Sequence, residues 1–189
     1  MTTKLANLFS CLLLENDIIT SEEVSIYSYL FEYIIENVIY FTITIIIGIL
    51  RGNIWYGIVM YLVNSLFRSY GGGAHASTKE LCVVISYGIV FFIVFFVPFV
   101  AERLGCVWGI LYAISGAIIF LISPVDCCNK RLDKLKKRNL KVKCQISIIV
   151  ISIVFMIMNL FDMKDFCAII AVTTFVNGIG EIIGVLADR

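Results

Sequence analysis

The sequence predicts an all-α, polytopic membrane protein with about six membrane segments and an amphipathic N-terminal helix. Hydrophobic residues make up 60% of the 189 residues and charged residues only 15%, whereas a soluble domain carries about 45–50% apolar and about 25% charged residues. The stretch 81–101 contains no charged residue, and about 20 apolar residues suffice to cross the hydrocarbon core. This uninterrupted run excludes a soluble protein with a large core.

Residues 1–36 are predicted to form an amphipathic N-terminal region. Its first apolar stretch is short and soon followed by acidic residues rather than a small-residue cleavage site, so a secretory signal peptide is not expected. Thr20 and Glu23 have the spacing of a capping box, which predicts a helix over 20–36. Apolar residues then recur at helical spacing, opposite acidic ones. We expect this helix to lie on the membrane surface, although it lacks the basic face usual for anionic lipid.

Six apolar segments follow, at residues 37–50, 54–67, 81–101, 104–123, 145–161 and 166–187. The first two are about 14 residues long, so each is tilted, re-entrant or continuous with the preceding helix. Four full crossings are expected from the others. Small residues recur every fourth position in two segments, which favours either close helix contact within the chain or a dimer interface. They are Gly105, Gly109, Ala113 and Ala117, and Gly180 and Gly184.

Basic residues predict the orientation of the chain. The loop 124–144 holds eight of the fifteen Lys and Arg residues, and such a cluster beside membrane ends belongs in the cytoplasm. Counting crossings back from this loop places the turn at 102–103 outside and the loop 68–80 inside. Any site in the loop 68–80 is therefore expected to face the cytoplasm.

Cysteine spacing gives no sign of a disulfide framework or a metal site. The seven cysteines form no CxxC pair, and the chain has a single histidine. A structural zinc site is therefore poorly supported, and no metal, cofactor or nucleic-acid partner is expected.

The single histidine, His75, follows the glycine run 71–73 and precedes Cys82 by seven residues. A thiol and an imidazole are the minimum equipment of a cysteine peptidase. In one continuous helix the two side chains would be separated by about 10 Å along the axis, too far for a hydrogen bond.

A helix start between the two residues removes this difficulty. Ser77 and Glu80 have capping-box spacing, which predicts a helix from Thr78 with Ser77 as N-cap. His75 then precedes the helix and can fold back over its first turn, where the helix dipole favours a thiolate. Cys82 is predicted to be the nucleophile and His75 the base and then the acid. The alternative is an ordinary membrane-helix cysteine and an interfacial histidine.

Arg68, the Gly-Ala-His75-Ala sequence after the glycine run, and Cys82 together resemble the signature of the accessory gene regulator B (AgrB) family. These are membrane-embedded cysteine endopeptidases that mature quorum-sensing peptides. The resemblance extends over nearly the whole chain, including its size, its amphipathic start and its basic loop. Ser123-Pro124-Val125-Asp126 is similar to the family's proline-containing motif at that loop. The prolines expected after this motif are replaced by Cys and Arg here.

This resemblance implies a single peptidase domain over 1–189, multi-pass in a bacterial cell membrane, with a catalytic loop and helix start at 68–82 and a basic cytoplasmic loop at 124–144. Its substrate would be an AgrD-like precursor peptide with an acidic C-terminal tail. Cys82 would cleave before that tail and keep the signal as an acyl thioester. An internal thiol or hydroxyl of the substrate would then release a cyclic thiolactone or lactone. A homodimer is also implied.

Three further residues have expected supporting roles. Arg68 either binds the acidic tail through its guanidinium group or anchors the chain at the interface. Gly73 gives the backbone freedom at the site. Glu80 is near enough in sequence to orient His75, although its predicted capping role competes.

Two other classes of protein remain open from the residues alone. A small membrane peptide transporter would use the polar membrane residues Glu181, Asn64 and Asn177 as a path and would not need the Cys82 thiol. A non-enzymatic scaffold would be held by its small-residue faces. Glu181 is either a functional intramembrane carboxylate or, near a helix end, simply reaches water.

Overall fold

The computed structural model describes residues 2–72, 78–125 and 134–187, and in these the chain is helical without strands. The all-α prediction is confirmed. The chain divides into two compact units, residues 1–43 and 44–189. The helices are α1 (Thr2–Glu15), α2 (Val24–Leu50), α3 (Ile54–Tyr70), α4 (Lys79–Phe91), the π-helix η1 (Phe92–Phe96), α5 (Val97–Leu104), α6 (Val107–Ile122), α7 (Lys134–Leu160) and α8 (Lys164–Ala187).

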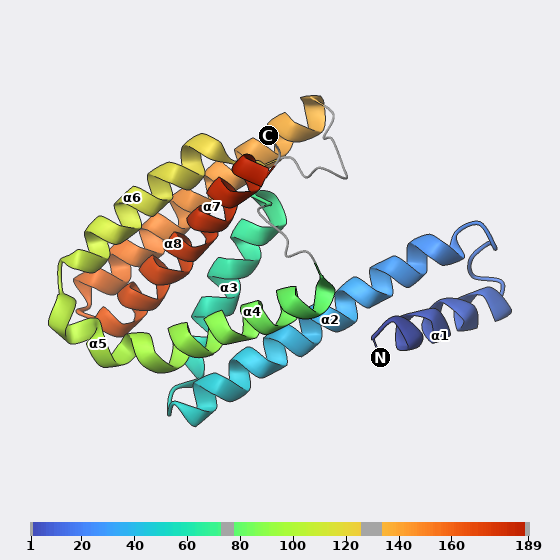
Figure 1. Ribbon diagram of the computed structural model, residues 1–189, viewed down its shortest axis with the longest axis horizontal. Coiled ribbons are helices and arrows are strands. Elements are labelled where there is room, and N and C mark those ends of the chain that lie inside the picture. The colour runs from blue at the N-terminus through green and yellow to red at the C-terminus, as the bar shows by residue number, and fades with distance from the viewer. Residues whose placement is uncertain (1, 73–77, 126–133, 188–189) are drawn as a thin grey trace. The chain divides into compact units, whose positions relative to one another are not determined.

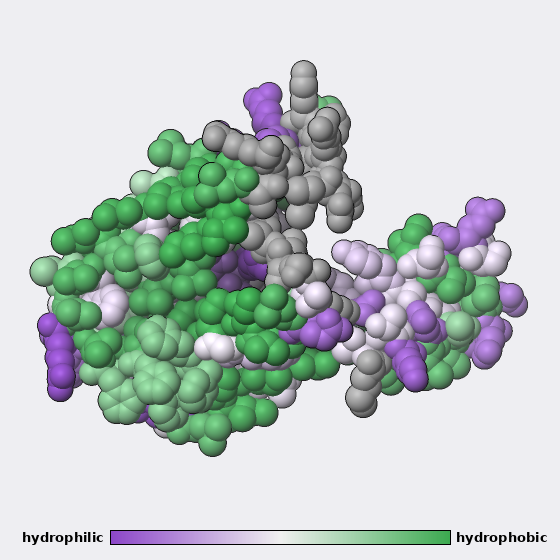
Figure 2. Space-filling view, viewed as in Figure 1, coloured by the Kyte–Doolittle hydropathy of each residue, from purple (hydrophilic) through white to green (hydrophobic). Residues whose placement is uncertain are grey.

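Four helical stretches of the described chain are long and apolar enough to cross a membrane: Val24–Leu50, Glu80–Leu104, Leu135–Leu160 and Lys164–Leu186. Val107–Ile122 is a shorter apolar helix. The predicted segments 20–36 and 37–50 are largely one continuous helix, which was one of the alternatives for the short first segment. Hydrophobic residues cover most of the face shown in Figure 2. The chain is a multi-pass membrane protein.

The N-terminal unit pairs α1 with the first half of α2 through polar side chains. Thr3 Oγ1 donates a hydrogen bond to Glu32 at 2.7 Å, and the Ser28 hydroxyl donates to Asn7. Many of the apolar side chains of both helices are exposed instead, among them Leu8, Leu12, Ile26, Tyr29 and Ile34. The amphipathic start is therefore a helix pair linked by polar hydrogen bonds and by the Phe9–Phe31 ring contact, with many apolar side chains left outside.

Thr20 and Glu23, whose spacing predicts a capping box, are hydrogen-bonded to each other just before α2. Both the backbone N–H and the hydroxyl of Thr20 donate to Glu23 Oε2 at 2.9 Å. These hydrogen bonds, the backbone one foremost, lower the pKa of the Glu23 carboxyl. The regular helix begins directly afterwards, at Val24.

α8 is the central helix of residues 44–189. It packs against α6, α3, α5 and α7, and Figure 1 shows it running alongside α6 and α7. The residues from Phe166 to Ala171 are all buried, which is why its first half has no polar face. Between the outer helices, Tyr112 of α6 and Phe155 of α7 stack with ring centroids 4.5 Å apart.

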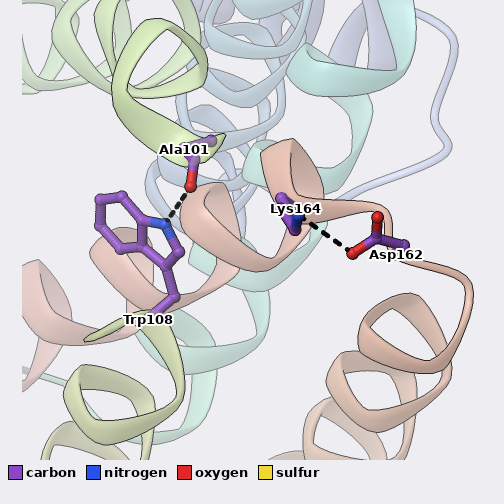
Figure 3. A network of polar contacts seen from close by, with 4 residues as sticks. All are labelled: Ala101, Trp108, Asp162 and Lys164. Carbon is purple, nitrogen blue, oxygen red and sulfur yellow. Dashed lines mark hydrogen bonds and ion pairs between the residues drawn. The ribbon is translucent and has the colours of Figure 1, made fainter. Parts of the chain in front are cut away.

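α4, η1 and α5 form one continuous, curved helix (Figure 1). Pro98 has no N–H to donate to the carbonyl four residues earlier, and the wider π-helical turn lies directly before it. The helix ends at Gly105, whose φ of +32° suits a residue without a β-carbon. Trp108 Nε1 then donates to the Ala101 carbonyl at 2.9 Å and closes the turn to α6 (Figure 3).

The turn between α7 and α8 lies at the same end of the bundle as the turn between α5 and α6. Figure 3 shows the ion pair of Lys164 and Asp162, with 3.3 Å between Nζ and Oδ1, beside the Trp108–Ala101 hydrogen bond. The turn at 102–103, which the charge pattern predicts to be outside, therefore shares one end with the turn between α7 and α8.

The small-residue stripe of α6 makes no close helix contact with the described part of the chain, which was one of its two alternatives. Ala113 and Ala117 are exposed, and a β-carbon at Gly109 would have no neighbour within 4 Å. α6 instead buries Trp108, Tyr112, Ser115 and Ile119, because large aromatic side chains remove more apolar area from water than small ones. The close approach of α6 to α8 is at Gly178, where a β-carbon would lie 3.6 Å from the Ser115 carbonyl oxygen.

Candidate functional site

Cys82 lies at the end of the first turn of α4. Thr78 is the N-cap: its backbone is extended, and its Oγ1 accepts a hydrogen bond from Leu81 N at 3.3 Å. The Cys82 N–H bonds to the Thr78 carbonyl at 3.1 Å, the first full helical hydrogen bond of α4. The prediction of Ser77 as N-cap was wrong by one residue, because the Thr78 hydroxyl supplies the acceptor. Glu80 is exposed at the second helical position and does not complete a capping box.

α4 makes few contacts with the described part of the bundle apart from η1, into which it continues. Leu81, Val83, Val84 and Ile85 are all exposed, and the Cys82 side chain between them is half-buried. A helix that is apolar on all sides suits a lipid environment. The thiol therefore lies where a helix with an apolar surface begins.

The other end of the predicted catalytic loop is the C-terminus of α3. Arg68 is half-buried in its last turn and has an interaction partner. Gly71 follows as the C-cap, and its N–H donates to the Phe67 carbonyl at 2.7 Å. Gly72 has a φ of +79°, the left-handed conformation that favours glycine. His75 and Gly73 lie outside the described residues.

Gly71 is held from two sides. Its carbonyl accepts a hydrogen bond from Val125 N at 2.9 Å, so the glycine segment and the predicted proline-containing motif lie together. On its other side the Glu181 carboxylate approaches the Gly71 backbone so closely that a β-carbon at Gly71 would collide with Oε1. A β-carbon would also lie 2.9 Å from the Phe67 carbonyl oxygen. These close neighbours favour glycine here, and the backbone conformation does not, since a φ of −84° suits any residue.

Glu181 is 1% exposed, although it lies near the end of α8. The alternative that it simply reaches water is therefore wrong. The Ser123 hydroxyl donates to the carboxylate and lies 2.7 Å from Oε1 and 2.6 Å from Oε2. Cys144 of α7, also 1% exposed, lies near Ser123 and Glu181. The carboxylate lies where the C-terminal ends of α3 and α6 meet α7 and α8.

A row of buried polar residues continues from Glu181 along α8. Asn177 Nδ2 donates to Asn64 Oδ1 of α3 at 3.1 Å and to the Thr173 carbonyl at 2.9 Å. Thr173 Oγ1 is buried without a hydrogen-bond partner. The three polar residues named for a transporter path thus lie at one α3–α8 interface, and two of them bond to each other.

Basic residues of α7 lie at the same end of the bundle as Gly71. Lys143 Nζ is 5.7 Å from the centre of the Tyr70 ring, and the exposed residues Lys136, Lys137 and Lys141 precede it on α7. The glycine segment and the basic loop therefore share one end, as the charge-based topology requires. Within the described residues, no three His, Cys, Asp or Glu side chains gather as metal ligands would.

The structure brings together Gly71, Ser123 and Glu181, which the sequence patterns indicated separately but not as one group. Gly71 belongs to the glycine run and Ser123 to the proline-containing motif, while Glu181 stood out as a carboxylate in an apolar segment. Their contact joins the loop before His75 to the loop before the basic cluster. Arg68 lies on α3, whereas Cys82 and Glu80 both lie on α4.

The family model for accessory gene regulator B matches residues 3–180 of this chain. The chain belongs to the AgrB family. Two relatives from Clostridium perfringens are similar to it: the "Putative AgrB-like protein" of strain SM101 at 27% identity and the "Putative AgrB-like protein 2" of strain 13 at 26%. Each match covers 62% of this chain and 58% of the relative, so the chain spans under two thirds of their length. No solved structure matches it.

Proposed function

We propose that the chain is a membrane-embedded cysteine endopeptidase of a bacterial quorum-sensing system, with Cys82 and His75 as its catalytic pair. The observation that carries this proposal is the AgrB family match over residues 3–180, which includes the glycine run, the single histidine and Cys82. Cys82 is half-buried near a helix N-terminus, where the helix dipole favours negative charge on sulfur.

Covalent geometry is compatible with a Cys82–His75 pair. His75 is three residues from Gly72 and three residues from Thr78, and three residues of chain span at most about 11 Å. The imidazole is thus tied to the end of α3 and to the start of α4. Since Cys82 is one turn into α4, a histidine that folds back over the Thr78 cap reaches the thiol.

The proposed substrate is an AgrD-like precursor peptide with an acidic C-terminal tail. His75 takes the Cys82 thiol proton, and the thiolate attacks the carbonyl carbon of the peptide bond before the tail. The C–N bond breaks, His75 returns the proton to the leaving amine, and the tail departs. The signal segment then remains as an acyl thioester on Cys82.

Ring closure releases the product. An internal thiol of the substrate gives up its proton and attacks the thioester, and the Cys82 thiolate leaves and is reprotonated. Exchange of one thioester for another is nearly neutral in free energy, so this step needs no ATP. Hydrolysis is the competing reaction, and an apolar, water-poor setting around the start of α4 disfavours it. A serine in the substrate would give a lactone instead.

The basic end of the bundle is proposed to face the cytoplasm and receive the acidic tail. Arg68, Lys143 and the lysines before it surround the end at which Gly71 lies. Guanidinium and ammonium groups there attract carboxylates, and positive residues are retained on the cytoplasmic side. The exposed small residues Ala113 and Ala117 of α6 offer a face for the homodimer that the family implies.

The buried polar residues of α8, Glu181, Asn177 and Thr173, favour a transporter as the second candidate. Polar residues inside a membrane bundle often mark a substrate path. Here Asn177 bonds to Asn64 and Glu181 to Ser123. These mutual bonds are equally those of a polar interface that holds helices together, so the peptidase is preferred.

Mass spectrometry of the purified protein in lipid vesicles, mixed with a precursor peptide encoded beside its gene, tests the proposal. Wild type is expected to release the tail and carry an acyl adduct on Cys82. Cys82→Ala and His75→Ala should do neither, and Cys106→Ala, at the opposite end of the bundle, should behave as wild type. Tail release that survives Cys82→Ala would reject the peptidase mechanism, and passage of intact peptide into sealed vesicles would favour the transporter.

A further inference from the structure

We infer that Glu181 is a positioning residue, which acts with Ser123 to fix the point at which the chain leaves α3 toward His75. This inference rests on the proposed function, and it adds a role for a carboxylate that lies outside the Cys–His motif. More than 100 residues separate Glu181 from His75 in the sequence, so only the fold connects the two.

The first step of the argument is the cost of burying the carboxylate. Glu181 is 1% exposed, and an acidic group so far from water is retained only where it has hydrogen-bonding partners. Ser123 supplies one, at 2.6 and 2.7 Å from the two carboxylate oxygens. Ser123 is itself buried, at 3% exposed, so this pair has little freedom to move.

The second step is the contact with Gly71. Oε1 of Glu181 occupies the place where a side chain at position 71 would begin. The Gly71 backbone is thus enclosed by the carboxylate on one side and by the Val125 hydrogen bond on the other. Val125 lies two residues after Ser123, and Glu181 accepts the Ser123 hydrogen bond. One connected group of residues therefore encloses the glycine.

The third step is direction. Gly72 adopts its left-handed φ of +79°, and a β-carbon there would lie 3.0 Å from the Val125 carbonyl oxygen. The same motif therefore restricts two successive glycines, and the chain reaches His75 three residues later. Gly71 and Gly72 are thus the restricted start of the segment that carries His75. Misplacement of a catalytic group by about 1 Å can reduce a rate about 100-fold.

The test uses the full chain in lipid vesicles and two readouts. The first is the single-turnover rate of acyl-thioester formation on Cys82 at saturating precursor peptide. The second is copper-catalysed formation of a disulfide between Cys82 and a His75→Cys substitution, identified by mass spectrometry. The second readout reports proximity and needs neither peptide nor catalysis.

Glu181→Ala is expected to slow thioester formation about 10- to 100-fold with little change in KM, and to slow the disulfide. Gly71→Ala should do the same, because its methyl group displaces the carboxylate. The double variant should be less impaired than the product of the two single effects, since no carboxylate then remains to displace, while the methyl group still lies 2.9 Å from the Phe67 carbonyl oxygen. Thr173→Val is the matched control: it is a buried substitution on the same helix at a hydroxyl without a hydrogen-bond partner, and it should leave both readouts unchanged.

The outcomes separate this inference from the proposed function. Absence of both the thioester and the 75–82 disulfide with Glu181 intact would reject the catalytic pair itself. If Glu181→Ala forms both the thioester and the disulfide as fast as the protein with Glu181 intact, the positioning role is overturned. The proposed peptidase activity would be unaffected by that result. Effects of Gly71→Ala and Glu181→Ala that simply multiply in the double variant would also overturn it.

Discussion

At the scale of single residues, the hydroxyl of Thr78 sets where the cysteine lies in its helix. It accepts the Leu81 N–H and so begins α4 one residue later than the capping-box pattern indicates. The Ser-Thr pair at 77–78 offers two hydroxyl groups in adjacent positions, and both are favoured N-caps. Sequence spacing cannot distinguish the two, because the N-cap is the residue whose own backbone is extended, and spacing does not reveal that.

Thr78→Ala is predicted to fray the first turn of α4, since loss of an N-cap costs about 0.5–2 kcal/mol. Amide hydrogen exchange of residues 79–83, measured by mass spectrometry in lipid, should accelerate. Thr78→Ser keeps the hydroxyl and should retain protection close to that of wild type. Equal exchange in all three proteins would show that Thr78 does not cap the helix.

The Glu23 carboxylate gives a pH-dependent helix start. Its pKa is lower in the folded chain than in the unfolded one because Thr20 donates two hydrogen bonds to it. Its contribution is therefore fully present above the unfolded value of about 4.3 and is lost as pH falls through the folded value. Compared with Glu23→Gln, wild type should protect the amides of residues 24–27 better at pH 6. The difference should vanish below the folded pKa; a constant difference would contradict this assignment.

At the scale of helices and turns, aromatic side chains decide which face of α6 is buried. Trp108 and Tyr112 face inward, with Ser115 and Ile119 along the same side, and the small-residue stripe faces outward. The periodicity of small residues was detectable in the sequence, but their partner was not. Burial of large rings at the α6–α7 and α6–α8 contacts outweighs close backbone packing.

Trp108→Phe is predicted to destabilise the turn between α5 and α6. The change keeps an aromatic ring but leaves the Ala101 carbonyl without its indole donor, at a cost of about 1–3 kcal/mol for a buried group. Thermal unfolding in detergent should begin at a lower temperature. Trp55, the other tryptophan, is 60% exposed, so Trp55→Phe is the control and should unfold as wild type. A shift of equal size in both variants would contradict the turn's role.

At the scale of the whole molecule, charge and hydropathy predicted much of the architecture. The helical class, the long apolar segments and the shared end of the glycine and basic loops all followed from composition and run length. The convergence of Gly71, Ser123 and Glu181 did not, because it depends on how the ends of α3 and α6 meet α8. Such contacts join residues far apart in sequence and leave no local pattern.

The predicted topology can be checked by labelling intact cells with a membrane-impermeant maleimide. Cys106 is exposed in the turn between α5 and α6, at the end predicted to be outside, and should react. Cys82 should react only after the membrane is opened, and a Cys106→Ala variant should lose the external label. Labelling of Cys82 from outside without labelling of Cys106 would reverse the proposed orientation.

The pairing of α1 with α2 has a consequence for how the chain assembles. In water, a helix pair that is linked by polar hydrogen bonds and leaves Leu8, Leu12 and Tyr29 exposed gains little from the hydrophobic effect. In hydrocarbon the preference reverses, because polar side chains then seek each other and apolar ones dissolve in the lipid. Residues 2–43 are thus expected to pair only after the bilayer has taken them up, which makes the lipid itself a requirement for folding this part of the chain.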